Sequence, residues 1–286
     1  MDTASFNARC NDGEDKGTGA TIERKTCTTW DGVLIVYSAA GSGLVGLVFI
    51  HGGLANRTFW DGELKEFAAH YRVIAPDLAG HGESGTNRNR WGIPEFGADI
   101  QAVVEAEHLE KVILFGNSLG GPVAIEAALL LPGRVLGVVG VDTFQSLAYT
   151  MTPDQARQRA DAFRDDYASS LKRMVKSLFH TDADPAVVAD AEQRMAQTSP
   201  EVAHTMFLSL AGYDVSASTR YLQVPLLAIN GDLYPTDTQA VRTVKADFDV
   251  VVMKHVGHYP MLERPAEFDR LVAAVADRLR IPLQPA

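Results

Sequence analysis

A serine between two glycines, in the run Gly116-Asn117-Ser118-Leu119-Gly120, follows an apolar stretch and precedes an amphipathic one. In a G-x-S-x-G turn the serine hydroxyl is exposed on a tight strand-to-helix bend, and side chains at the glycines would clash with neighbouring elements. The N–H groups that begin the following helix favour negative charge developing near the serine. The pattern predicts Ser118 as a nucleophile. The alternative is a glycine-rich turn whose serine only caps the helix.

A base for this serine is predicted in the run Lys254-His255-Val256-Gly257-His258-Tyr259-Pro260, which follows a late apolar stretch. A loop histidine there can reach a serine at the same edge of a sheet and take its proton. His258 follows a glycine and precedes an apolar, proline-containing stretch that could fix its ring, so we predict it as the general base. His255 lies nearer the apolar stretch and is interpreted as structural.

The third member of such a site is a carboxylate that orients the imidazole and stabilises its charged form. Asp232 follows the apolar run Leu226–Ile229 and gives the chain order Ser, Asp, His, so it is the predicted acid. Asp142, directly after the run Val135–Val141, is the alternative. Asp237 is a third candidate that could instead cap a following helix.

Two backbone N–H groups are expected to hold the oxyanion of a tetrahedral intermediate. One is the N–H of Leu119, just after the serine, and the other is the N–H of Gly53 in the run His51-Gly52-Gly53-Leu54. The glycines there let the backbone approach a ligand closely. Leu54 is the alternative donor to Gly53, and His51 is interpreted as a residue that braces the loop.

Short apolar runs alternate with stretches of helical spacing, which predicts an α/β fold with a mostly parallel sheet flanked by helices. The predicted strands are Val33–Ser38, Leu44–Ile50, Tyr71–Ala75, Val112–Gly116, Val135–Val141, Leu226–Ile229 and Val250–Met253. The predicted helices between them are Phe59–Ala69, Phe96–Leu109, Leu119–Leu131 and Pro265–Leu279.

The alternation stops between residues 145 and 221, where only helical patterns occur. They are Pro153–Lys176, Pro185–Ala196 and Ser199–Leu210, each beginning near a proline suited to a first helical turn. We therefore predict a flexible tail (1–20), a core (21–144 and 222–286) and an inserted helical cap (145–221). Trp60 and Trp91 are expected at the mouth of the pocket, and its candidate apolar lining is Phe144, Leu147, Tyr149, Met151, Phe163, Phe179, Met206, Phe207 and Tyr213.

The composition of the 286 residues, with 26 basic and 36 acidic side chains and a net charge of −10, argues against nucleic acid and anionic membranes as partners. No apolar run is long enough to span a bilayer. Cys10 and Cys27 show no metal or redox spacing, so two free thiols are favoured over a disulfide. With no apolar signal segment at the start, we expect a cytoplasmic protein.

Four stretches together resemble the α/β-hydrolase superfamily, in its lidded, serine-dependent branch: VFIHGGLANRTFW, DLAGHGESG, LFGNSLGG and GHYPMLERPAEF. With the order of predicted strands, the resemblance covers roughly residues 30–145 and 222–282. It implies a triad of Ser118, His258 and an acid, and hydrolysis of a small-molecule substrate without a metal or organic cofactor. The family often has G-x-x-D before its acid, whereas Gly231 and Asp232 are adjacent here, which puts the acid in doubt.

The resulting hypothesis is a serine hydrolase that cleaves an ester-type bond of a small, largely apolar substrate through an acyl-enzyme. A carbon–carbon bond hydrolase or a lactonase with the same triad is an alternative, because the cap rather than the triad selects among these reactions. A non-catalytic ligand-binding receptor on the same fold is a further alternative. It would predict a broken triad, which Ser118 and His258 argue against.

Overall fold

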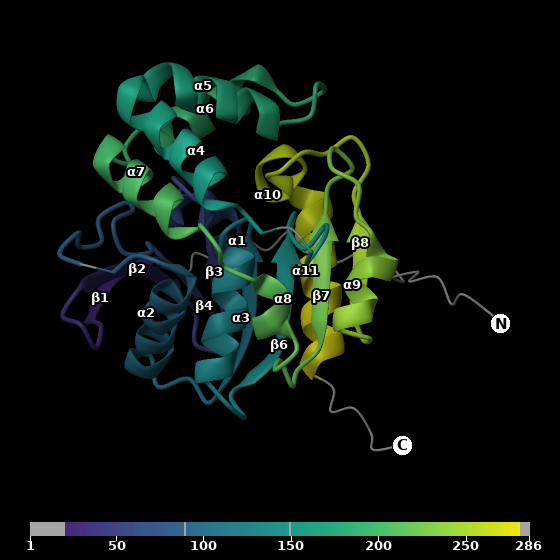
Figure 1. The fold of residues 1–286 in the computed structure, drawn as a ribbon. Coiled ribbons are helices and arrows are strands. Elements are labelled where there is room, and N and C mark those ends of the chain that lie inside the picture. Colours follow the sequence, from purple (N-terminus) through teal and green to yellow (C-terminus); the bar gives the residue numbers. More distant parts are fainter. Residues whose placement is uncertain (1–20, 89, 149, 281–286) are drawn as a thin grey trace.

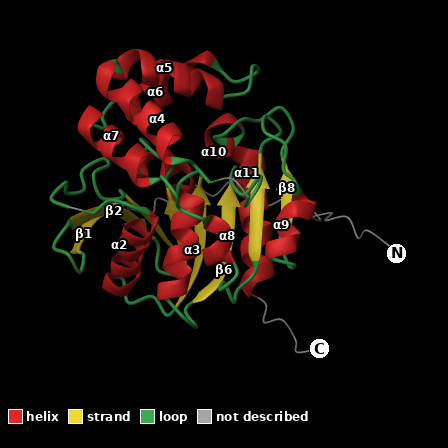
Figure 2. Ribbon diagram, in the orientation of Figure 1, coloured by secondary structure: helices red, strands yellow, loops and turns green. Residues whose placement is uncertain are grey.

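An eight-stranded sheet lies at the centre of the molecule, with helices packed on both of its faces (Figure 1, Figure 2). The computed structural model describes residues 21–88, 90–148 and 150–280. The strand order is β1-β2-β4-β3-β5-β6-β7-β8, in which β2 runs antiparallel to β1 and β4 and all other neighbours are parallel. The strands are β1 (Glu23–Thr28), β2 (Leu34–Ala40), β3 (Val45–Ile50), β4 (Arg72–Pro76), β5 (Lys111–Asn117), β6 (Val135–Val141), β7 (Leu226–Asn230) and β8 (Asp249–Val252).

The mostly parallel α/β fold is as predicted, and each predicted strand is present with small shifts at its ends. Continuous burial of β3 to β7 explains the apolar runs, because helices cover both faces of these strands. Strand β1 lacks the apolar run that predicts the other strands. Its residues ERKTCT are mainly polar and exposed, since this edge strand pairs only with β2.

Helices of the core occupy the two faces in separate apolar clusters. On one face, α2, α3 and α9 pack on the sheet, and on the other α1 and α11 do so. The core helices are η1 (Arg57–Trp60), α1 (Asp61–Phe67), α2 (Ile93–Ala106), α3 (Gly120–Leu130), α9 (Thr238–Val244), α10 (Pro260–Glu263) and α11 (Pro265–Arg280).

Four further helices lie together above the carboxyl ends of the parallel strands (Figure 2). They are α4 (Pro153–Asp165), α5 (Tyr167–Leu178), α6 (Pro185–Met195) and α7 (Pro200–Ser209). The single helix predicted over Pro153–Lys176 is wrong, because Asp166 ends α4 and its carboxylate caps α5 by accepting from the N–H of Ser169. Prolines stand in the first turn of α4, α6 and α7 as expected.

The short helix α8 (Val215–Thr219) falls inside the predicted cap range but packs against α3 of the core (Figure 1). The division into core and cap at residues 145 and 221 stays a prediction. The predicted tail, 1–20, lies outside the described residues, as does Cys10. Cys27 is half-buried on β1, where burial raises the pKa of its thiol to about 11.

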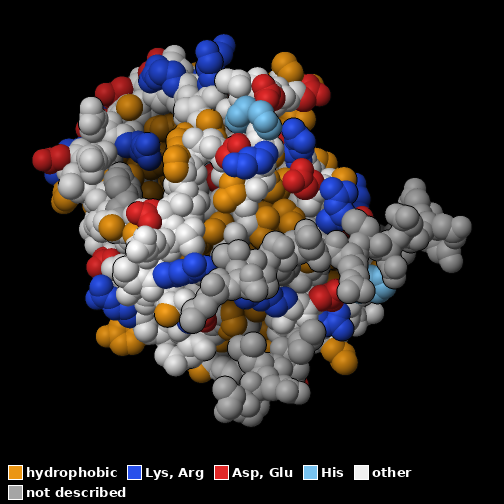
Figure 3. All heavy atoms as spheres, turned by 90° about the vertical axis from the view of Figure 1, so that its right-hand side faces the viewer, with side chains coloured by type: hydrophobic (Ala, Val, Ile, Leu, Met, Phe, Trp, Pro, Cys, Tyr) orange, Lys and Arg blue, Asp and Glu red, His pale blue; other side chains and the backbone are white. Residues whose placement is uncertain are grey.

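On the face formed by β8, α9 and α11, basic and acidic side chains are interspersed (Figure 3). Asp249 of β8, for example, pairs with Arg242 of α9 and Arg278 of α11. None of the helices in the described ranges combines the length and apolarity needed to cross a bilayer. The predicted cellular location stays a prediction.

Candidate active site

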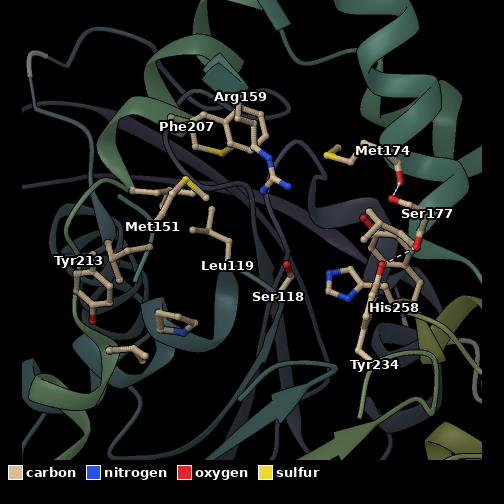
Figure 4. Close-up of a pocket in the computed structure, with 18 residues that line it drawn as sticks. Ser118, Leu119, Met151, Arg159, Met174, Ser177, Phe207, Tyr213, Tyr234 and His258 are labelled. Atoms are coloured by element: carbon tan, nitrogen blue, oxygen red, sulfur yellow. Dashed lines mark hydrogen bonds between the residues drawn. The ribbon is translucent and has the colours of Figure 1, made fainter. Parts of the chain in front are cut away.

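The turn from β5 into α3 holds Ser118 in a left-handed conformation, with φ of 53°. The flanking glycines are required by close backbone packing. A Cβ on Gly116 would lie 2.1 Å from the carbonyl oxygen of Gly120, and one on Gly120 would lie 2.5 Å from the carbonyl oxygen of Ile50. Both distances are far shorter than any real Cβ contact. The G-x-S-x-G spacing therefore reflects a backbone bend pressed against β3, which leaves the Ser118 side chain pointing into a cavity (Figure 4).

The imidazole of His258 faces the Ser118 hydroxyl across this cavity (Figure 4). Its Nδ1 lies 2.5 Å from Oδ2 of Asp142, whose side chain is fully buried. Asp142 also accepts a hydrogen bond from the N–H of Gly231, at 3.0 Å. Because Nδ1 donates to a carboxylate, Nε2 is the nitrogen left to accept a proton from the Ser118 side.

The predicted contact between Asp232 and His258 is wrong. The Asp232 carboxylate accepts from the N–H of Val256 at 3.3 Å and lies 3.9 Å from the ammonium of Lys254. Asp142, the alternative weighed from the sequence, occupies the place expected for the acid. It follows β6, and its φ of 44° turns the chain at the strand end.

An amide that the sequence analysis did not single out, that of Asn117, ties this arrangement together. Its Nδ2 donates to the carbonyl oxygens of Val141 and His258, both at 2.9 Å, and its side chain is fully buried. The N–H of Ser118 donates to the same Val141 carbonyl. Asn117 thus joins the serine turn to the end of β6 and to the histidine loop. The position of Asn117 directly before the serine of the G-x-S-x-G motif could have indicated this role from the sequence.

Glu263 of α10 was also missed, although an acid in the first turn after Pro260 could have indicated a helix-start role. Its carboxylate accepts from the N–H groups of Gly257 at 3.0 Å, His180 at 3.2 Å and Tyr259 at 3.3 Å. Burial raises the pKa of this carboxyl above its ordinary value. The side chain fixes the histidine loop on both sides of His258 and links it to the segment after α5.

The end of α5 also contacts this loop directly. The carbonyl of Leu178, the last residue of α5, accepts from the N–H of His258 at 2.6 Å. The carbonyl of Ser177 accepts from the hydroxyl of Tyr234 at 2.7 Å. These bonds satisfy carbonyls that a helix end leaves without partners. A Cβ on Gly257 would lie 2.5 Å from the Leu178 oxygen, so the approach of α5 requires the glycine before His258.

The predicted oxyanion donors Gly53 and Leu119 line the same cavity as Ser118. Within the described part of the chain, neither their N–H groups nor that of Leu54 donates a hydrogen bond. His51 lies beneath them, fully buried, with its Nε2 accepting from the N–H of Leu78 at 3.0 Å and its Nδ1 2.7 Å from the carbonyl of Gly52. His51 therefore braces the loop, as interpreted from the sequence.

The chain matches the family model described as "Alpha/beta hydrolase family" over residues 47–271. It belongs to the α/β-hydrolase family. A similar curated protein is 3-oxoadipate enol-lactonase 2 of Acinetobacter baylyi, 25% identical over 81% of this chain and 88% of that protein. Another is the pimeloyl-[acyl-carrier protein] methyl ester esterase of Nitrosospira multiformis, 24% identical over 78% of this chain and 90% of that protein.

Among solved structures, a thermophilic esterase from Thermogutta terrifontis superposes with a TM-score of 0.80, covering 91% of this chain and 100% of that chain at 23% identity. At 23% sequence identity, this structural similarity shows that the two proteins share a fold. Together the family model and the curated relatives support a hydrolase role for this α/β hydrolase.

The cavity of this hydrolase has a volume of about 400 Å³ and is mainly apolar. Of the predicted lining residues, Met151, Met206, Phe207 and Tyr213 line it, while Phe144 and Phe163 border neighbouring hollows. The other predicted residues lie elsewhere: Leu147 and Phe179 in the core, and Tyr149 outside the described residues. The predicted places of Trp60 and Trp91 are wrong, because these rings pack against Phe49 and Phe96 respectively and do not border the cavity.

The remaining candidates serve other contacts. Asp237 caps α9, accepting from the N–H of Ala240. His255 lies near His180 and Asp182, with its Nδ1 3.1 Å from Oδ2 of Asp182. In the described ranges, the side chains of His180, Asp182 and His255 form the group whose ligand atoms lie close enough together to hold a metal ion. None of these three residues lines the Ser118 cavity.

Close packing at the serine turn leads to a stability prediction. Gly116→Ala should lower the free energy of unfolding by about 2–3 kcal/mol, since its Cβ would overlap the backbone of Gly120. Gly62→Ala is the matched control, because a Cβ there meets nothing within 4 Å and lies in helix α1, where alanine should stabilise by up to about 1 kcal/mol. Urea unfolding measures both, and equal stabilities would contradict the assignment.

Two buried histidines beneath the site lead to a pH prediction. Burial lowers the pKa of His51 to about 4 and that of His81 to about 3, from an ordinary 6.5. At pH values between these lowered pKa values and 6.5, each histidine binds more protons in the unfolded chain than in the folded one. The free energy of unfolding should therefore fall below pH 6.5, by up to about 1.4 kcal/mol per pH unit for each histidine.

Urea unfolding from pH 7 to pH 5 of the native chain and of His81→Asn isolates one of these contributions. The asparagine amide nitrogen lies where Nδ1 lies in histidine, so it can still donate to the Ala79 carbonyl that His81 Nδ1 approaches at 3.1 Å. The variant should lose less stability on acidification than the native chain. An identical pH dependence in both proteins would mean that His81 is not buried as the neutral form.

Proposed function

We propose that this α/β hydrolase cleaves an ester bond of a small, largely apolar substrate through an acyl-enzyme on Ser118. The observation that carries the proposal is the facing of Ser118 and His258 in one cavity, with the far nitrogen of His258 held by buried Asp142. The apolar lining of that cavity suits a substrate of the same character. The Ser118 hydroxyl and the His258 imidazole are not hydrogen-bonded to each other, and such bonds often tighten only when substrate is present.

In the proposed reaction, Nε2 of His258 takes the Ser118 proton as Oγ attacks the substrate carbonyl carbon. The carbonyl oxygen becomes an oxyanion that accepts hydrogen bonds from the N–H groups of Gly53 and Leu119. The imidazolium then gives its proton to the departing alkoxide, which leaves an acyl group on Ser118. Water, deprotonated by His258, attacks this acyl group, and Ser118 recovers its proton as the carboxylic acid departs.

Asp142 has two roles in this proposal. Its hydrogen bond keeps the proton on Nδ1, so that Nε2 is the basic nitrogen, and its charge stabilises the imidazolium that forms. The bond from Gly231 N–H fixes the carboxylate itself. A lactone is an internal ester, so the same steps would open one, and the enol-lactonase relative makes lactones the second substrate class to assay.

An activated serine is tested with a fluorophosphonate probe and intact-mass measurement. The native chain should gain one adduct, and Ser118→Ala should gain none. Short p-nitrophenyl esters assayed in parallel should be hydrolysed by the native chain alone. A folded native protein that takes up no probe would overturn the proposed triad and favour a non-catalytic binding protein.

The identity of the acid is tested by a pair of isosteric substitutions. Asp142→Asn should lower kcat by about 10⁴-fold, because an amide cannot hold His258 in the basic tautomer. Asp232→Asn should leave kcat unchanged, since that side chain contacts Val256 and Lys254 instead. Steady-state ester hydrolysis measures both, and circular dichroism confirms folding. A loss confined to Asp232→Asn would reverse the assignment.

A further inference from the structure

Among the residues that the structure describes, one arginine or lysine, Arg159 of α4, lines the cavity above Ser118, and no aspartate or glutamate does so. The chain as a whole carries a net charge of −10. The described cavity lining, which has an arginine and no carboxylate, therefore has the opposite sign of charge. Figure 4 shows the guanidinium pointing into the cavity towards the Ser118 hydroxyl.

Other polar side chains of the cavity are already bonded within the protein. The hydroxyl of Ser177 donates to the carbonyl of Met174 at 2.7 Å, and that of Tyr234 donates to the carbonyl of Ser177 (Figure 4). Tyr213 donates to Glu126, at 2.7 Å, outside the lining. These groups are therefore poorly placed to recognise a polar part of a substrate.

Among the described lining residues, Ser118, His258 at Nε2 and Arg159 have side-chain polar groups without any hydrogen-bond partner in the protein. Across residues 21–88, 90–148 and 150–280, Arg159 forms neither a hydrogen bond nor an ion pair. The first two side chains make up the proposed reacting end of the cavity. The guanidinium therefore provides a separate binding point for another part of the same substrate.

The guanidinium of Arg159 is held by an aromatic ring. Its Cζ lies 5.5 Å from the centre of the Phe207 ring, a cation–π distance. This contact places the guanidinium over the ring, and within the described residues its N–H donors have no partner. A guanidinium keeps its charge at all working pH values and matches a carboxylate with two parallel hydrogen bonds.

We propose that Arg159 binds a free carboxylate at the far end of the substrate while the scissile carbonyl lies at Ser118. The substrate class is then a monoester of a dicarboxylic acid, or its lactone counterpart, with an apolar chain along Leu119, Met151 and Met206. A single arginine in an apolar cavity suits one carboxylate better than a doubly charged phosphate. This inference rests on the proposed ester hydrolysis and specifies its substrate.

The test compares p-nitrophenyl monoesters of adipic, pimelic and suberic acids with the corresponding monoamides, which have the same shape but no charge. For the chain length that fits, the native protein should have a kcat/KM for the acid about 10- to 100-fold higher than for the amide, as a charge-assisted hydrogen bond would give. The difference should lie mainly in KM, because the carboxylate is remote from the reacting carbonyl.

Arg159→Gln should bring the acid-to-amide ratio of kcat/KM down to about one, and Arg159→Lys should retain part of the preference for the acid. Arg157→Gln is the matched control. It removes the same charge from the same helix, two residues earlier. Both arginines are exposed, but Arg157 lies outside the cavity lining. Its acid-to-amide ratio should equal that of the native chain.

Equal rates on acid and amide at every chain length would overturn the proposal, as would an Arg159→Gln effect of the same size on both. The fluorophosphonate experiment separates this failure from that of the proposed function. A protein that labels at Ser118 but shows no preference for the acid has the triad without the carboxylate site. A protein that does not label lacks the proposed reaction, and the substrate inference fails with it.

Discussion

Close backbone contact at the end of β5 is the constraint on which the site depends. The bend at Ser118 fits only because Gly116 and Gly120 carry no Cβ, so that the turn can lie against its own helix and against the end of β3. This contact brings the serine beside the loop after β3, where Gly53 lies, and beside the end of β6, where Asp142 lies. Parallel strands present their carboxyl ends at one edge, and the bend gathers three of these ends around one cavity.

The fold could be predicted from the sequence because its signals are local and strong. Strands buried on both faces are continuously apolar, and the glycines and prolines that bound them mark the turns. The edge strand β1 lacks that signal because only one neighbour covers it. The break between α4 and α5 was missed because Asp166 carries the cap of the second helix inside an unbroken helical pattern.

The turn that holds Ser118 was also predictable, because local backbone geometry requires its glycines. The partner of His258 was not, because two acids follow neighbouring strands and only the loop conformations decide between them. A Cβ on Gly231 would lie 2.2 Å from the carbonyl of Val256, so the chain after β7 is pressed against the histidine loop. From there Asp232 contacts the backbone of that loop, while the Gly231 N–H binds Asp142. Asn117 acts through contacts distant in sequence, and Glu263 joins its near neighbours Gly257 and Tyr259 to the distant His180, which spacing does not reveal.

The bonds between the end of α5 and the histidine loop have a thermodynamic consequence. Since the Leu178 carbonyl and the Glu263 carboxylate both bind the loop that carries His258, α5 cannot move away without changing the energy of that loop. The position of α5 and the orientation of the His258 imidazole are therefore thermodynamically coupled. A ligand that stabilises this position of α5 also stabilises this orientation of the ring, by the same coupling free energy. A ligand that contacts only the helices above the sheet would thereby alter the orientation of a ring it does not touch.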